Sequence, residues 1–176
     1  MKKETWLKAV AGGMNIVCRR SGPQDLPYIQ AFWREQWSAE FIVAHGEVYR
    51  PDGLEGFIAL YGAEWVGLIT YVCRGRECEV VFLNSLREKQ GIGTRLIENV
   101  AAEARRAGCE RLFLVTTNDN LEALGFYQKR GFELVSVHRA AVDEARKIKP
   151  AIPLIGLHGI PLRDELELEM GLPGPG

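Results

Sequence analysis

The first half of the chain alternates short apolar runs with polar turns, which is the pattern of a β-sheet. The predicted strands are residues 16–19, 57–61, 65–73 and 80–83. Gly62-Ala63-Glu64 separates the second run from the third, and Gly75 marks the turn before the fourth. Because turns this short join neighbouring antiparallel strands, residues 57–83 are predicted to form an antiparallel meander.

Helical spacing of apolar residues appears before and after this meander. The first helix is predicted to end near Trp37, and one of its faces carries Leu26, Ile29, Trp33 and Trp37. These side chains are interpreted as core, or as one wall of a substrate pocket. The second helix follows Gly93, and its apolar face consists of Leu96, Ile97, Val100, Ala101 and Ala104.

The strand at 80–83, this second helix and a further strand at 111–115 form a strand–helix–strand unit. Such a unit implies a parallel pair of strands with a right-handed crossover. The elements predicted after it are a helix at 121–130, a strand at 132–137, a short helix at 140–147 and a last strand within 162–170. The expected fold class is therefore α/β, with a mixed and mostly antiparallel central sheet and helices on both faces.

The chain of 176 residues suggests one domain with appendages. Residues 14–170 are expected to form this single domain, with residues 140–170 as its appended helix and last strand. Residues 1–13 are predicted to be a flexible N-terminal extension, and 171–176 a disordered tail. Residues 38–55 show no periodicity and are interpreted as an irregular, acidic loop. Loops of this length often bind ligands, although each carboxylate is also consistent with a solvated surface.

Charge and composition exclude several classes of partner. A net charge of −1 and an isoelectric point near 6.3 give no basic field for nucleic acid. The apolar runs are too short to span a membrane. Cys18, Cys73, Cys78 and Cys109 form no C-x-x-C motif and no zinc spacing, so no metal is expected. Without a signal peptide, a cytoplasmic protein with reduced cysteines is predicted, with Cys73 and Cys78 facing each other across a hairpin.

The turn Gly91-Ile92-Gly93-Thr94 opens the second helix. A Gly-x-Gly turn there presents free backbone N–H groups and the positive end of the helix dipole to an anion. A phosphate-bearing cofactor is one interpretation, and an ordinary tight turn is the other. A dinucleotide fingerprint is excluded because Leu96 stands where its third glycine belongs, and a P-loop because no lysine follows Gly93.

A second motif lies one strand later: Asn120-x-x-Ala123-x-x-x-Tyr127-x-Lys129-x-Gly131-Phe132. Together with the glycine turn, this run resembles the GNAT superfamily of N-acetyltransferases over about residues 14–137. One position departs from the family pattern: Glu88 stands where Gln or Arg is usual. A carboxylate there would repel a pyrophosphate, so Glu88 is expected to point away.

The resemblance implies acetyl-CoA as the co-substrate and assigns roles to single residues. The backbone of Gln90, Gly91, Ile92, Gly93 and Thr94 would hold the pyrophosphate. The backbone near Leu83 and Ser85 would pair with the pantetheine arm, and Asn120 would contact the cofactor near the thioester. Tyr127 would donate a proton to the departing CoA sulfur. The alternative for Tyr127 is a packed side chain whose hydroxyl bonds a backbone group.

Glu79, at the start of the predicted strand, resembles the glutamate that serves as base in some family members. A solvated carboxylate is the alternative, and other members use a chain of water molecules instead. Glu47 and Glu77 are weaker candidates. The resulting hypothesis is N-acetylation of a small-molecule primary amine by a monomer or homodimer. Acetylation of a protein N-terminus or lysine, and acyl-CoA sensing without turnover, are the alternatives.

Overall fold

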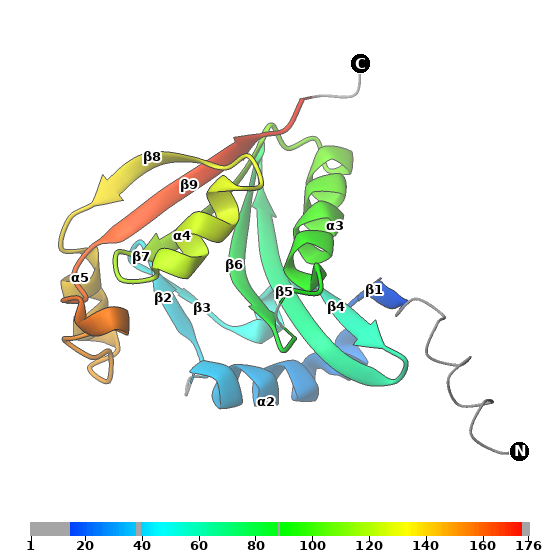
Figure 1. Cartoon of the computed structure of the whole chain (residues 1–176), viewed down its shortest axis with the longest axis horizontal. Coiled ribbons are helices and arrows are strands. Elements are labelled where there is room, and N and C mark those ends of the chain that lie inside the picture. The colour runs from blue at the N-terminus through cyan, green and yellow to red at the C-terminus, as the bar shows by residue number, and fades with distance from the viewer. Residues whose placement is uncertain (1–14, 38–39, 88, 174–176) are drawn as a thin grey trace, which may run out of the picture.

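The computed structural model describes residues 15–37, 40–87 and 89–173. Its main feature is a seven-stranded sheet in the order β1-β4-β5-β6-β7-β9-β8 (Figure 1). The strands are β1 (Ile16–Arg20), β4 (Glu55–Tyr61), β5 (Glu64–Arg74), β6 (Glu77–Ser85), β7 (Arg111–Thr117), β8 (Glu133–His138) and β9 (Glu165–Gly171). The helices are α2 (Leu26–Trp37), α3 (Ile92–Arg106), α4 (Leu121–Gln128) and α5 (Ala141–Ile148).

All neighbouring strands in this sheet are antiparallel except β6 and β7. The parallel pair is joined through α3, as the strand–helix–strand pattern predicted. The expected fold class is therefore confirmed. None of the helices in the described residues combines the length and the hydrophobicity needed to cross a membrane.

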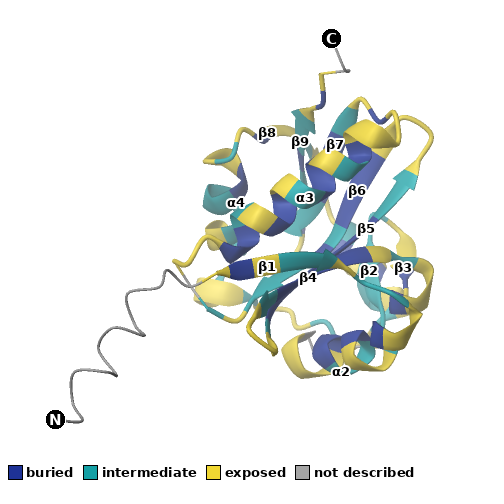
Figure 2. Cartoon of the chain, turned by 90° about the vertical axis from the view of Figure 1, so that its right-hand side faces the viewer, coloured by how far each residue is buried: buried dark blue, intermediate teal, exposed yellow. Residues whose placement is uncertain are grey.

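The helices lie on both faces of the sheet, with α3 and α2 on opposite sides of β1 and β4 (Figure 2). One core lies between the sheet and α3 and α4, and it includes Leu96, Val100, Leu112 and Tyr127. The other lies under α2 and contains Ile29, Trp33, Tyr49 and Phe82. The apolar stripe of α2 is thus core at Ile29 and Trp33, while the side chain of Trp37 lies outside the described part of the chain.

The sheet opens between β6 and β7. These strands pair only over Glu77–Val80 and Arg111–Leu114, although β6 continues to Ser85. On the other edge of β6, Tyr71 pairs with Val80 and Thr70 with Phe82, so Val81 is an extra, bulged residue. A bulge bends its strand and increases the local twist. The bend coincides with the point where the β6–β7 ladder ends, and the edge of β6 beyond it has no partner strand among the described residues.

The prediction of an irregular loop at 38–55 was wrong. Residues Ile42–Ala44 (β2) and Glu47–Tyr49 (β3) form a small antiparallel hairpin, followed by a 3₁₀ turn at Pro51–Gly53. Strands of three residues are too short to show an alternating pattern. The turn residues His45 and Gly46 both have positive φ, 38° and 84°, as a two-residue hairpin of the I′ type requires. Asn-Gly would have signalled this turn, but His-Gly did not.

Two boundaries also differ from expectation. Helix α3 begins at Ile92, so Gly93 lies inside its first turn rather than before it. The predicted disordered tail begins too early, because Gly171 ends β9 and Leu172 is buried, its N–H bonded to the carbonyl oxygen of Glu110 at 2.7 Å. The predictions for residues 1–13 and for Glu88 concern residues outside those that the structure describes, as does the end of the tail, 174–176.

Candidate active site

The first turn of α3 has the properties of an anion site. Gly91 is its N-cap, with φ of 74°, and no side chain of a described residue caps the helix. The first backbone N–H groups of a helix have no partner within it, so those of Ile92, Gly93 and Thr94 are available to a ligand. A Cβ atom built on Gly91 would meet no heavy atom within 4 Å, which leaves the approach open. These features fit the pyrophosphate of a cofactor.

The side chains of Ile92 and Thr94 in this turn contact other residues of the protein. Ile92 is buried in the core. The Thr94 hydroxyl accepts hydrogen bonds from Nε and Nη2 of Arg130, at 2.8 and 2.6 Å. The Arg130 guanidinium also lies 3.5 Å from the ring centroid of Phe126. If this turn holds a cofactor, it therefore does so through the main chain, and Arg130 places a positive charge beside it.

Leu83 and Ser85 lie on the unpaired stretch of β6. They pair with Ile69 and Gly67 of β5 on one side, whereas no strand in the described residues pairs with them on the other. A main chain with unpaired N–H and C=O groups can accept an extended ligand as an added strand. Gln90 is exposed in the connection to α3. The expected pantetheine edge and pyrophosphate turn are thus joined by one short loop.

Asn120 is the N-cap of α4, and its side-chain oxygen accepts a hydrogen bond from the N–H of Ala123 at 3.1 Å. This capping bond explains why an asparagine stands at this position without any ligand. It uses the amide oxygen and leaves the amide nitrogen, which forms no hydrogen bond to a described residue. Contact with a cofactor therefore remains a prediction that the capping role does not prevent.

Tyr127 is buried in α4, with its ring against Phe126 and Phe132. Burial raises the pKa of its hydroxyl above the ordinary value of 10, and Arg130 lowers it by a smaller amount. The hydroxyl makes no hydrogen bond to any residue that the structure describes, so the alternative of a backbone-bonded hydroxyl is not supported. The group is protonated at neutral pH and has its proton available to a ligand.

Glu79 is buried, at 4% exposure, and the interpretation of it as a solvated carboxylate was wrong. Its Oε2 accepts a hydrogen bond from the Tyr49 hydroxyl at 2.7 Å, and its Oε1 lies 2.8 Å from Nε2 of His45. Tyr49 and His45 both belong to the β2–β3 hairpin or its turn. The hairpin, which no sequence pattern predicted, therefore brings two polar side chains to the candidate base.

Side-chain alternation along β6 places Glu79 on the opposite face of the sheet from Tyr127. Cys78 and Val80, on either side of Glu79, belong to the core that contains Tyr127. Neighbouring residues of a strand point to opposite faces, so Glu79 faces the side of α2 and the hairpin. The β6–β7 ladder ends one residue after Glu79, at Val80. A ligand threaded through the opening would then have the candidate acid on one side and the candidate base on the other.

A small cavity of about 170 Å³ lies beside Glu79. It is lined by His45, Glu47, Val72, Arg74, Glu77, Glu79 and Phe113. Arg74 is paired with Glu47 at 2.6 Å, and Glu77 with Nε of Arg111 at 2.9 Å. Glu47 and Glu77, the weaker base candidates, thus line the same cavity but have arginine partners.

The sequence of the chain is similar to those of known proteins. Residues 23–132 match the model of the Acetyltransferase (GNAT) family. The "Uncharacterized protein YxbD" of Bacillus subtilis (strain 168) is 42% identical over 156 residues, which cover 88% of this chain and 97% of that protein.

Two solved structures are similar in fold, each at 21% sequence identity. A GNAT family acetyltransferase from Elizabethkingia anophelis with acetyl-CoA bound has a TM-score of 0.67, over 90% of this chain and 99% of that one. IAA acetyltransferase from Bacillus cereus ATCC 14579 has a TM-score of 0.65, over 90% and 100% of the two chains. At this identity the likeness concerns the fold.

Proposed function

The chain belongs to the GNAT acetyltransferase family, and we propose that it moves an acetyl group from acetyl-CoA directly to a primary amine of a small molecule. The observation that carries this proposal is the opening of the sheet between β6 and β7, which ends at the uncapped first turn of α3. An extended thioester with a charged pyrophosphate needs both features, an unpaired strand edge for its arm and free N–H donors for its phosphates.

The chain's own residues divide the work of acetyl transfer. The main chain of Gln90 to Thr94 holds the pyrophosphate, and that of Leu83 and Ser85 aligns the arm. Asn120 contributes its free amide nitrogen near the thioester. As the amine attacks the carbonyl carbon and the C–S bond breaks, Tyr127 gives its proton to the departing sulfur. Glu79 is one of the residues that together take the proton from the amine.

The cavity beside Glu79 supports a small acceptor. A volume of about 170 Å³ fits an amine-bearing group of a few heavy atoms rather than a folded surface. Three carboxylates against one arginine in its lining favour a cationic molecule. The side chain of a lysine or the N-terminus of a peptide would also present such a group, so protein acetylation is the second candidate. A third is an acyl-CoA sensor that binds the cofactor without turnover.

The test is CoA release with a panel of small amines and of peptides, measured for the wild type and for Tyr127→Phe. We expect acetyl-CoA to stabilise the protein against heat, small amines to be turned over faster than peptides, and Tyr127→Phe to bind the cofactor but react slowly. A preference for peptides favours protein acetylation. Tight binding without turnover of any amine favours the sensor. Stabilisation by ATP but not by CoA contradicts all three.

A further inference from the structure

We propose that His45 is the residue that takes the proton from the acceptor amine, and that Glu79 is the positioning residue that orients and supports it. This inference rests on the proposed function and refines it, because it assigns the contact with the acceptor to a different side chain. The family resemblance pointed to Glu79 or to a chain of water molecules, with Glu47 and Glu77 as weaker candidates, and not to His45. The hairpin that carries His45 was not expected at all.

Exposure and existing hydrogen bonds distinguish the two side chains. The side chain of Glu79 is 5% exposed and that of His45 is 25% exposed. Both oxygens of Glu79 already have partners, Oε1 the imidazole at 2.8 Å and Oε2 the Tyr49 hydroxyl at 2.7 Å. A carboxylate enclosed in this way is well placed to hold an imidazole and poorly placed to meet an acceptor. Both side chains line the cavity, and His45 is the more exposed of the two.

The main chain of His45, like its side chain, has a buried glutamate as its hydrogen-bond partner. Its N–H donates to Oε2 of Glu165, a buried carboxylate of β9, at 2.9 Å. Its φ of 38° lies in the left-handed region, which only a few per cent of non-glycine residues adopt. A histidine in this conformation, anchored by two buried glutamates, is a pre-organised group rather than an ordinary turn residue.

The hydrogen bond to Glu79 also sets the tautomer of the neutral ring. With the carboxylate ionised, Nε2 must carry the proton, and Nδ1 then has a free lone pair. No described residue bonds Nδ1. As the C–N bond forms, Nδ1 takes one proton from the amine, and Glu79 stabilises the imidazolium. Tyr127 supplies the proton for the sulfur, so the imidazolium and the phenolate return to their starting states by exchange with solvent.

The charges around His45 determine its titration. The hydrogen bond to Glu79 raises its pKa above the ordinary 6.5, burial lowers it by less, and the charges of Glu47 and Glu165 raise it further. Arg74 of β5 and Glu77 of β6 also line the cavity, and the hydroxyl of Tyr49 lies 3.2 Å from Nε2. A base acts in its unprotonated form, so the rate must rise with pH through a pKa above 6.5.

The experiment compares the pH dependence of kcat/KM for the wild type, His45→Gln, Glu79→Gln and the control His138→Gln. His138 also contacts a carboxylate, Glu167 at 2.9 Å, but it does not line the cavity. We expect a rising limb above pH 6.5 in the wild type and the control. His45→Gln should lose this limb and about 10²–10⁴-fold in rate. Glu79→Gln should keep it, shifted to lower pH.

A measurement without substrate gives the same information independently. NMR titration of the free protein should show the His45 imidazole titrating above 6.5, and at lower pH in Glu79→Gln. Unchanged acetyl-CoA affinity in each variant would show that the fold is intact. A rising limb that survives in His45→Gln would overturn this inference alone. Absence of turnover in the wild type with every amine would overturn the proposed function together with it.

Discussion

A Cβ atom placed on Gly93 would lie 2.9 Å from Cζ of the Phe126 ring. The two residues belong to different motifs, Gly93 to the glycine turn at the start of α3 and Phe126 to α4. Real Cβ contacts at this distance essentially do not occur. The second glycine of the turn is therefore needed for packing between the two helices, whatever its value to a ligand.

Gly93→Ala should destabilise the protein by roughly 1–3 kcal/mol, the usual cost of forcing a methyl group into a packed site. Urea unfolding measures this change. The double variant Gly93→Ala/Phe126→Leu should lose less than the sum of its single variants, because the smaller side chain makes room. Additive losses would contradict the contact.

Gly125→Ala is the matched control for that substitution. Gly125 lies in α4, and a Cβ atom there would meet nothing within 4 Å. Alanine in a helix is favoured over glycine by about 0.5–1 kcal/mol, so this variant should be neutral or more stable. If Gly125→Ala lost as much stability as Gly93→Ala, replacement of a helical glycine, and not a clash with Phe126, would explain both losses.

The bond between Arg130 and Thr94 predicts a second coupling between the helices. Thr94→Val removes the oxygen that accepts two donors of the guanidinium. Hydrogen bonds to charged groups contribute about 1.5–3 kcal/mol, and part exposure of Arg130 puts the expected loss at the lower end. Thr94→Ser keeps the hydroxyl and should stay close to the wild type. Unfolding of both variants and of Arg130→Ala, in a double-mutant cycle, would show whether the pair is coupled.

The same variants address the cofactor. Because Arg130 places its charge beside the turn that we propose for the pyrophosphate, Arg130→Ala should weaken acetyl-CoA binding, and Thr94→Ser should not. Isothermal titration measures both affinities. Equal affinity in Arg130→Ala and the wild type would show that the main chain of the turn acts without this charge.

The sheet could be predicted from the sequence because its signals are local and regular. Long apolar runs gave β4, β5 and β6, and the amphipathic face of α3 gave the crossover to β7. The two motifs of the family resemblance fixed the candidate residues on β6, α3 and α4. Each of these features depends on residues that are close together in the chain.

The surroundings of Glu79 could not be predicted in this way. The bonds from His45 and Tyr49 to Glu79 span 34 and 30 positions of the sequence, and the bond from His45 to Glu165 spans 120. The hairpin that brings these side chains to β6 consists of strands too short for a periodic signal. The one sign of this hairpin in the sequence was a histidine followed by a glycine within an apolar stretch.

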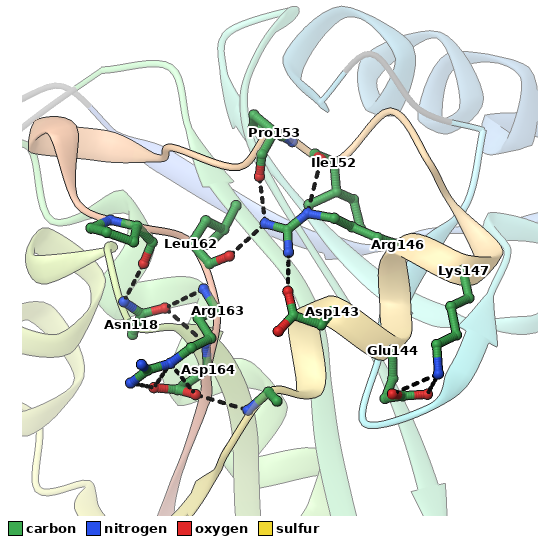
Figure 3. Close-up of polar contacts among 12 residues, drawn as sticks. Asn118, Asp143, Glu144, Arg146, Lys147, Ile152, Pro153, Leu162, Arg163 and Asp164 are labelled. Carbon is green, nitrogen blue, oxygen red and sulfur yellow. Dashed lines mark hydrogen bonds and ion pairs between the residues drawn. The ribbon is translucent and has the colours of Figure 1, made fainter.

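The C-terminal segment offers a fourth prediction. Arg146 of α5 donates to the carbonyl oxygens of Ile152, Pro153 and Leu162, at 3.2, 2.6 and 2.5 Å, as Figure 3 shows. This one side chain ties α5 to the segment between it and β9. Arg146→Ala should cost about 1–3 kcal/mol and raise hydrogen exchange in residues 149–162.

Lys147→Ala is the control for Arg146→Ala. Lys147 is paired with Glu144 on α5 (Figure 3). Both side chains are at least 66% exposed. Exposed pairs contribute little, so unfolding should change by less than about 1 kcal/mol and exchange in 149–162 should not change. Equal effects of the two substitutions would contradict the role assigned to the carbonyl contacts.

The last prediction concerns pH and the turn before α2. The buried Asp25 accepts hydrogen bonds from Nη1 and Nη2 of Arg19, at 2.7 and 2.8 Å, and from the N–H of Gly22 at 2.9 Å. The bonds from Arg19, more than any other contact, lower the pKa of Asp25. The unfolded chain therefore binds a proton more readily than the folded one, so the contribution to stability is present above about pH 3.9 and is lost as the pH falls through the folded pKa.

Asp25→Asn should accordingly be less stable than the wild type at pH 7, by about 1 kcal/mol, since Arg19 is 38% exposed and solvent screens the pair. The difference should shrink below pH 3.9, where the wild type loses the same charge. Thermal unfolding of both proteins between pH 3 and 8 measures it, with the exposed Asp52→Asn as the control for removing a carboxylate. A difference that stays constant across this range would mean that Asp25 acts through its shape and neutral hydrogen bonds, and that its charge contributes nothing.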